Sequence, residues 1–285
     1  MSNINVLVFR DTIGKFDKSD TLKKMTEVSI KGQQVIKEAE QVTYEANKYS
    51  APCKIYVTKN GTMQAAANYS GKKVAVLNFA SATTPGGGVE KGASAQEECL
   101  CRVSNLFLCL SDKAVWEPFY QEHRNEKNNI HNDDIIYTPD VCVIKDDSYA
   151  DYPEAEQFNV DVITCAAPNL RENPNNPFNV YADAPTTIKP EELFRVHYKR
   201  ATKIMQVAAS KGAEVLILGA FGCGVFRNDP AIVARAYKEA LKNFRYAFKE
   251  VEFAIFCKWD WTNYNVFCNI FNEVSTLKQD SIKIE

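Results

Sequence analysis

Hydrophobic residues occur along this chain in two kinds of segment, and their alternation predicts an α/β fold. Short, nearly continuous apolar runs, typical of strands buried on both faces, cover residues 73–79, 160–165, 215–218 and 251–257. Segments with apolar residues at helical spacing lie between these runs. Strands that alternate with helices indicate a sandwich in which helices cover both faces of a mainly parallel or mixed sheet.

The remaining elements are predicted from helical periodicity and from turn residues. Residues 20–49 contain no proline and a single glycine, Gly32, and they read as a helical segment with a candidate break at that glycine. Further helices are expected at 63–69, 113–126, 191–209, 230–244 and 265–271, and further strands at 55–57, 135–137 and 141–144. The Asn- and Pro-rich residues 168–189 are expected to form a long surface loop.

No linker or internal repeat divides the chain. We therefore assign residues 1–70 to an N-terminal helical extension packed on the core, and residues 71–285 to one domain.

Composition excludes several classes of protein. Of the 285 residues, 45% are hydrophobic and 25% are charged, which is typical of a globular protein with a buried core. Lys and Arg total 34 and Asp and Glu total 36, so the net charge is -2 and a strongly basic nucleic-acid binder is excluded. No apolar run approaches the roughly 18 residues of a membrane-spanning helix, so we expect no membrane contact.

The nine cysteines indicate the compartment in which the protein works. Their number is odd, they include no C-x-x-C pair, and no histidines cluster near them. The first residues also lack the apolar run of a signal peptide. We therefore expect reduced thiols, no structural zinc and a cytoplasmic location, or a nuclear one in a eukaryote.

Two glycine-containing loops follow predicted strands, where open α/β sheets bind their ligands. The later loop carries Gly219, Gly222 and Gly224 and leads into a helix at Asp229-Pro230. Its backbone N–H groups can approach an anion without obstruction by Cβ atoms, so a phosphate or diphosphate is the expected ligand. The alternative is a tight turn that only lets strand and helix pack closely. The P-loop motif is missing and the dinucleotide fingerprint is incomplete, which argues against an ATPase and an oxidoreductase.

The earlier glycine loop leads into a helix that begins near Ser94 and carries two adjacent glutamates, Glu97 and Glu98. Ser94 and Glu97 fit the S-x-x-E pattern of a capping box, so a structural role and a catalytic role are both open for Glu97. Glu98 has no such structural explanation.

The direction of the two glutamates follows from the helical period. The apolar stripe of this helix consists of Cys99, Val103, Leu106 and Leu110. Both glutamates lie roughly 120° or more from the centre of that stripe, so they are expected to face away from the core, in a cleft beside the glycine loop. Neighbouring helical residues point in different directions, which favours one acid/base group and one positioning group over a pair that flanks a glycosidic bond.

The residues around both loops resemble poly(ADP-ribose) glycohydrolases of the compact microbial type, which are built on a macrodomain. Gly86-Gly87-Gly88, seven further residues and then Gln96-Glu97-Glu98 match the GGG-x(6-8)-QEE signature of that family. The blocks VLNFASATTPGGGVEKGASAQEECLCR, VITCAAPN and LGAFGCGVFRNDP agree with it in order between about residues 74 and 260.

The resemblance implies a three-layer α/β/α macrodomain with a mixed central sheet, an N-terminal helical extension and an ADP-ribose cleft at the strand ends. It implies that Glu98 protonates the leaving ribose hydroxyl and then activates water. Glu97 would place the bond by hydrogen bonding to ribose hydroxyls, Gln96 would support the loop, and Phe226 would pack on the distal ribose. The backbone contacts implied are Gly86, Gly87, Gly88 and Val89 for the distal ribose, and Gly222, Cys223, Gly224 and Val225 for the diphosphate.

The implied reaction is hydrolysis of the ribose-ribose O-glycosidic bond of poly(ADP-ribose), or of ADP-ribosylated macromolecules, with release of ADP-ribose. We expect a monomer that needs no metal or other cofactor. Two positions depart from the family pattern: Ser81 replaces an Asn that touches the ribose in many macrodomains, and Arg227 replaces a small residue. The alternatives are a mono-ADP-ribosyl or ADP-ribose-ester hydrolase, a non-catalytic ADP-ribose binder and a nicotinamide-dependent oxidoreductase.

Overall fold

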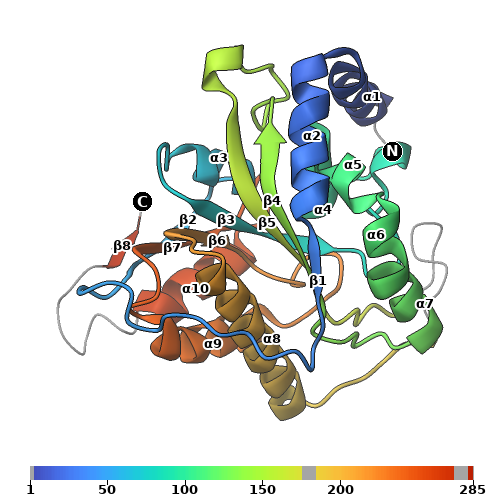
Figure 1. Cartoon of the computed structure of the whole chain (residues 1–285). Helices are drawn as coiled ribbons and strands as arrows, with labels where there is room; N and C mark the ends of the chain where they lie inside the picture. Colours follow the sequence, from blue (N-terminus) through green and yellow to red (C-terminus); the bar gives the residue numbers. More distant parts are fainter. Residues whose placement is uncertain (1–2, 175–183, 273–281, 285) are drawn as a thin grey trace. The chain divides into compact units, whose positions relative to one another are not determined.

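The computed structural model describes residues 3–174, 184–272 and 282–284 (Figure 1). By their contacts, the residues group into two compact lobes. The first lobe comprises residues 1–38 and 78–186, and the second lobe comprises residues 39–77 and 187–285. Each lobe is built from two separate stretches of chain, and the division into an extension up to residue 70 and a domain beyond it stays a prediction.

Antiparallel strands and several short helices make up the first lobe. Its helices are α1 (Asn3–Lys18), α2 (Asp20–Gly32), α4 (Gln96–Val103), α5 (Leu106–Leu110), α6 (Lys113–Val115) and α7 (Glu122–Glu126), with short turns η1 (Val89–Lys91), η2 (Trp116–Gln121) and η3 (Glu154–Glu156). Strand β4 (Ile135–Val143) pairs with β1 (Gln34–Ile36) and with β5 (Phe158–Ala166). Helix α2 packs along β4, as Figure 1 shows. Strand β5 is buried from Val160 onward, as the continuous apolar run predicts.

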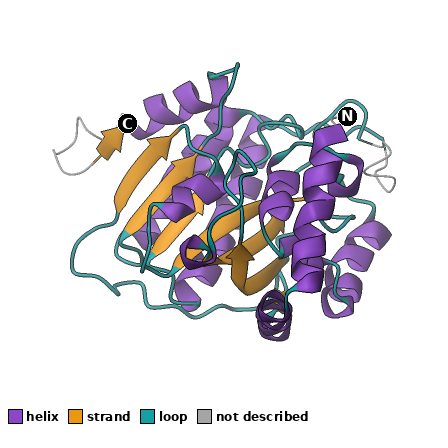
Figure 2. Cartoon of the chain, turned by 90° about the horizontal axis from the view of Figure 1, so that it is seen from above, coloured by secondary structure: helices purple, strands orange, loops and turns teal. Residues whose placement is uncertain are grey.

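Parallel strands make up the second lobe. In order they are β3 (Val74–Ala80), β6 (Val215–Leu218), β7 (Glu250–Ala254), β2 (Lys54–Thr58) and β8 (Ile282–Ile284), the short arrow beside the C label in Figure 2. Helices α8 (Pro190–Ser210), α9 (Pro230–Leu241) and α10 (Thr262–Asn272) follow in sequence and pack on one another, while α3 (Thr62–Ala67) contacts β6 and β7. The last residues of β3 belong to the first lobe. Parallel and antiparallel pairing together confirm the predicted α/β class with a mixed sheet.

The four apolar runs all form strands, and β6 spans the predicted residues 215–218. The predicted helix over residues 20–49 is wrong beyond Gly32. Residues 34–36 instead pair with β4, and residues 37–53 contain no helix or strand. Helix α2 ends at Gly32 because Gln33 is extended, with φ of -61° and ψ of 147°, and leads directly into β1. Glycine at position 32 also lets Pro139 of β4 pack closely, since a Cβ there would lie 2.5 Å from its Cγ.

Prolines alter the backbone inside two further predicted elements. The strands expected at 135–137 and 141–144 are one strand, β4, whose register shifts between Thr138 and Val141, around Pro139 and a left-handed Asp140 with φ of 51°. The helix expected at 113–126 is confirmed over those residues, where α6, η2 and α7 follow one another directly. Its middle, η2, is a π-helical turn that contains Pro118, which has no N–H to donate.

Three further expectations concern the cysteines, the loop 168–189 and membrane-spanning helices. All nine cysteines lie in described residues and none forms a disulfide. Of the predicted loop 168–189, residues 175–183 lie outside the described residues, and its described parts contain no helix or strand. Among the described residues, no helix is both long enough and apolar enough to span a bilayer.

Candidate active site

Helix α4 places Glu97 and Glu98 in its first turn, but both side chains are buried, with 2% and 7% of their surface exposed. The expectation that they face away from the core is therefore wrong, since the preceding loop folds back over the start of the helix. The capping box is also wrong. Ala95 is the N-cap and makes no side-chain cap, and Glu97 directs its carboxylate to β3 and the glycine loop instead.

Three groups from β3 and the following loop hold the carboxylate of Glu97. Its Oε1 accepts a hydrogen bond from Asn78 Nδ2 at 3.1 Å, and its Oε2 accepts one from the Ser81 N–H at 2.8 Å. The backbone of Gly86 supplies a further hydrogen bond. Asn78 Nδ2 also contacts Thr164 Oγ1 of β5 at 3.2 Å, so the two strands jointly fix the orientation of Glu97.

Burial, followed by the nearby charge of Glu98, raises the pKa of Glu97 to about 8. The hydrogen bonds from Ser81, Asn78 and Gly86 favour the charged form and oppose this rise. Because burial and repulsion prevail, Glu97 is mostly protonated at neutral pH. The buried Oδ1 of Asn78 has no hydrogen-bond partner, so a flip of its amide offers an acceptor to the protonated carboxyl group.

The raised pKa of Glu97 makes stability depend on pH. The pKa of about 8 in the folded protein lies above the roughly 4.3 of an unfolded glutamate, so the folded state holds the extra proton between these values. We expect the contribution of Glu97 to the free energy of unfolding to be fully present below this window and to be lost as the pH rises through it. The amide introduced by Glu97→Gln has no proton to lose, so the stability of this variant relative to wild type should increase between about pH 5 and pH 8. Urea unfolding of both proteins at the two pH values measures the change, and a constant difference would contradict the shift.

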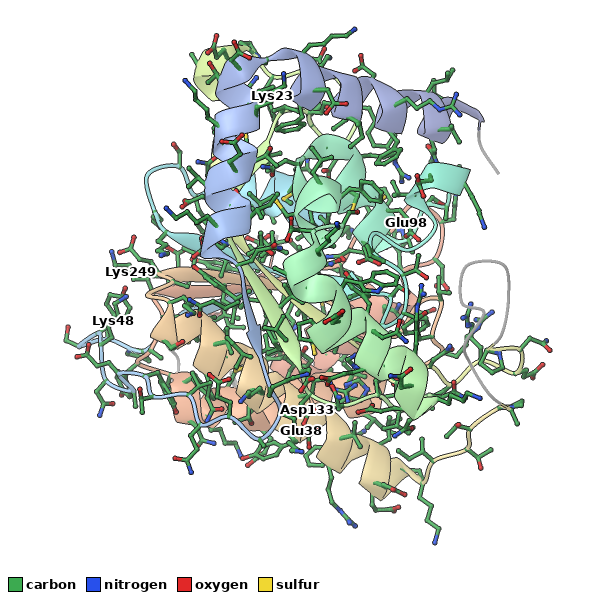
Figure 3. All side chains as sticks on the ribbon, turned by 45° about the vertical axis from the view of Figure 1, so that its right-hand side comes forward. Lys23, Glu38, Lys48, Glu98, Asp133 and Lys249 are labelled. Atoms are coloured by element: carbon green, nitrogen blue, oxygen red, sulfur yellow. The ribbon has the colours of Figure 1, made fainter. Side chains whose placement is uncertain are left out.

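Glu98 is held by the glycine loop. Its Oε1 accepts a hydrogen bond from the Gly88 N–H at 2.9 Å, whereas its Oε2 is buried and has no hydrogen-bond partner among the described residues. Glu98 is labelled in Figure 3, which draws the side chains on the ribbon. Gly87 has a φ of 57°, and a Cβ built on it would lie 2.5 Å from Oε1 of Glu98. The glycine is therefore needed both for the turn and for the close approach of the carboxylate.

The rest of the first loop is fixed by contacts to its surroundings. Gln96 Oε1 accepts a hydrogen bond from the Phe79 N–H at 2.9 Å, which ties the start of α4 to β3. Val89 is fully buried. Arg124 Nε donates to the Thr83 carbonyl at 2.7 Å from helix α7. In this lobe the structure thus brings together all the predicted residues from Gly86 to Val89 and from Gln96 to Glu98.

Sequence reasoning missed Asn78, Thr164 and Arg124. A signal was present for the first two, because each is a polar residue inside an otherwise apolar strand run and both are fully buried. Such residues need a hydrogen-bonding partner. No local signal marks Arg124.

The second loop, residues 219–226, leaves the end of β6 in the second lobe. Gly222 has a φ of 75°, and its carbonyl accepts hydrogen bonds at 3.1 Å from the backbone N–H and from Nδ2 of Asn228. Asn228 Oδ1 lies 2.8 Å from Nε2 of the buried His197. The pair of His197 and Asn228, which the sequence did not indicate, fixes the loop backbone at Gly222. Asp229 caps α9 through the Ala231 N–H at 2.8 Å, as the Asn-Asp-Pro sequence predicts.

The loop exposes some of its residues and buries others. Phe221 is fully buried and meets the His197 ring edge-on, so it is a core residue. Val225 is 53% exposed, Phe226 is half-buried, and open space surrounds Gly224. Of the predicted residues, Gly222 is buried and anchored by Asn228, Cys223 and Phe226 are half-buried, and Gly224 and Val225 are exposed.

Comparison with known proteins identifies relatives of this chain. The family model for the microbial-type PARG catalytic domain, PARG being poly(ADP-ribose) glycohydrolase, matches residues 10–146. No curated protein matches. The X-ray structure of PARG from Thermomonospora curvata is 29% identical, with a TM-score of 0.80 over 95% of this chain and 100% of that chain. PARG from Deinococcus radiodurans in complex with ADP-ribose is 30% identical, with a TM-score of 0.73 over 87% of this chain and 98% of that chain.

A further structure, the Thermomonospora curvata enzyme bound to the inhibitor ADP-HPD, is 28% identical with a TM-score of 0.77 and covers 94% of this chain and 99% of that one. These similarities confirm the macrodomain-like fold that the sequence resemblance implies.

Proposed function

The chain belongs to the microbial-type poly(ADP-ribose) glycohydrolase family and hydrolyses poly(ADP-ribose), and from this premise we propose that Glu98 is its catalytic acid and base. One observation carries the proposal. The Glu98 carboxyl group is anchored through Oε1 by the Gly88 N–H, while Oε2 is buried and unpartnered in the described structure. One oxygen is thus held in place, and the other is available for proton transfer.

The proposed reaction proceeds in two steps at the distal ribose. Glu98 gives its proton to the ribose oxygen of the leaving group as the bond from that oxygen to C1″ breaks, which leaves an oxocarbenium-like centre. Glu98 then removes a proton from a water molecule whose oxygen bonds to C1″. Free ADP-ribose results, and Glu98 regains its proton.

Glu97 is proposed to position the substrate. Its raised pKa favours a neutral carboxyl group, which can both donate to and accept from ribose hydroxyls. The anchoring by Asn78 and Ser81 supports a fixed orientation for those hydrogen bonds.

The two glycine loops are proposed to bind the remaining parts of ADP-ribose. The loop from Gly86 to Val89 is assigned to the distal ribose. Gln96 is assigned to supporting this loop, through its hydrogen bond with the Phe79 N–H. The loop from Gly222 to Val225 is assigned to the diphosphate, because it precedes the positive end of α9 and exposes Gly224 and Val225. Phe226, half-buried beside them, is assigned to the face of the distal ribose.

A substrate comparison tests this function. We expect wild-type protein to release ADP-ribose from poly(ADP-ribose) and to leave the last, protein-linked ADP-ribose in place on a mono-modified protein. Chromatography of the free ADP-ribose from both substrates measures the difference. Equal release from the mono-modified protein would identify a mono-ADP-ribosyl hydrolase, and binding without release from either substrate would identify an ADP-ribose reader.

A further inference from the structure

Charge is distributed unevenly between the two lobes, although the whole chain is nearly neutral. The second lobe contains 20 Lys and Arg residues against 13 Asp and Glu, whereas the first lobe contains 14 against 23. A polyanion is therefore attracted to the second lobe and repelled by the first. Because exposed charges are screened beyond about 8 Å at physiological ionic strength, binding also needs a local group of cations.

A local group of cations lies at the amino ends of the parallel strands of the second lobe. The Glu214 N–H donates to the Lys73 carbonyl at 2.8 Å, and the Lys249 N–H donates to the Glu214 carbonyl at 2.8 Å. The Lys54 N–H donates in turn to the Lys249 carbonyl at 3.0 Å, and the residue before Lys54 donates to the carbonyl of the exposed Arg245. Lys54, Lys73 and Lys249 are exposed, so they form a row across strands that lie about 4.8 Å apart.

Two tyrosines adjoin this row. Tyr246 is 38% exposed, and its carbonyl accepts a hydrogen bond from the Tyr49 N–H at 2.9 Å. Lys48 Nζ and Lys249 Nζ lie 5.3 Å and 5.6 Å from the ring centroid of Tyr49, and both lysines are labelled in Figure 3. Aromatic and cationic side chains therefore lie together here, as on surfaces that bind single-stranded nucleic acids.

Two carboxylates lie within the row, and each has a lysine partner. Glu214 accepts a hydrogen bond from Lys249 Nζ at 2.6 Å, and Glu250 pairs with Lys72 Nζ at 2.5 Å. Further positive charge at the row exceeds these two pairs, and it comes from Lys48, Lys54, Lys73 and Arg245.

We propose that this cationic edge binds units of poly(ADP-ribose) other than the unit being hydrolysed. It consists of Lys54, Lys73, Lys249, Arg245 and Tyr246. Each unit carries a diphosphate for the cations and a purine that can stack on an aromatic ring. The inference rests on the proposed function, which brings this polyanion to the chain, whereas no observation brings a nucleic acid or a second acidic protein to it.

The cationic edge is separate from the second glycine loop. That loop leaves the carboxyl end of β6, whereas Glu214 directly precedes its amino end, and the strand from Val215 to Leu218 spans roughly 13 Å. A polymer held at the loop by one unit keeps its other units at high local concentration near the edge. A second contact therefore raises the affinity for polymer without changing the affinity for a single unit.

The salt dependence of polymer binding tests the proposal. Lys54→Gln, Lys73→Gln and Arg245→Gln are combined in a Glu98→Gln background, and gel electrophoresis checks that the polymer stays intact. Each phosphate contact contributes about 0.7 to the slope of log affinity against log salt for a single-stranded polyanion, so three lost contacts lower the slope by about 2. Between 50 and 200 mM salt, the affinity of the background protein for long poly(ADP-ribose) should then fall roughly 20-fold more than that of the combined variant. The two proteins should bind free ADP-ribose equally.

Matched variants separate the edge from the total charge. Lys23→Gln, Lys24→Gln and Lys31→Gln together remove three charges from exposed positions of α2 in the first lobe, and should leave the slope unchanged. Lys54→Arg with Lys73→Arg keeps the charges of the edge and should also keep the slope. In otherwise wild-type protein, the glutamine variant of the edge should raise KM for long polymer and leave kcat unchanged.

Three results would overturn the cationic edge. They are an unchanged slope in its glutamine variant, an equal change in the α2 variant, and tighter binding of single-stranded DNA than of polymer at the same residues. Failure of the proposed function would instead show as no release of ADP-ribose by wild type, which the slope does not measure.

Discussion

Glu98→Gln is expected to lower kcat for poly(ADP-ribose) hydrolysis by about 10²–10⁴-fold, the usual contribution of general acid-base catalysis. Glutamine can still accept the hydrogen bond from the Gly88 N–H, so the loop keeps its anchor. It cannot donate a carboxyl proton or regain one from water. Affinity for ADP-ribose should therefore stay close to that of wild type. Single-turnover release of ADP-ribose, together with calorimetry, measures both quantities.

Glu90→Gln is the matched control. Glu90 lies in the short turn after the same glycine loop, but its side chain is exposed, so this variant removes an equal charge from the same region. It should retain wild-type kcat. If Glu98→Gln hydrolysed polymer at the wild-type rate while binding ADP-ribose, the proton transfer would have to be assigned to another residue.

The strands and the glycine loops could be predicted because their signals are local. A continuous apolar run suffices to locate β6, and the spacing of Gly86–Gly88 and Gln96–Glu98 suffices to place them together. The environment of the glutamates could not be predicted in the same way. The S-x-x-E pattern favours a cap within the helix, whereas Glu97 bonds to Asn78, 19 residues earlier in the chain.

Contacts between residues far apart in the sequence also explain the other wrong predictions. Residues 37–49 have helical composition but form no helix or strand, and Lys37 instead contacts Asp134 at 2.9 Å within the first lobe. The burial of Glu97 follows from the fold of residues 81–88, which no helical projection includes. Its raised pKa, and the division of roles between the two glutamates, therefore depend on tertiary contacts more than on helical position.

Gly87→Ala is expected to lower kcat about 10²-fold and to lower the free energy of unfolding only modestly. The φ of 57° costs alanine about 1–2 kcal/mol. Its Cβ would lie 2.5 Å from Oε1 of Glu98 and 3.1 Å from Oε2 of Glu97, and these flexible carboxylates can move to relieve the clash. That movement is what removes activity, because a displacement of about 1 Å at a catalytic group costs roughly 10²-fold.

Gly14→Ala makes the same substitution where nothing restricts it. Gly14 lies inside helix α1, and a Cβ there would meet no atom within 4 Å. This control should keep full activity and gain about 0.5–1 kcal/mol of stability. Steady-state kinetics and urea unfolding of both variants separate the two effects. If Gly87→Ala lost stability but kept its kcat, the glycine would serve only the turn, and the close approach of the loop to Glu98 would have no part in catalysis.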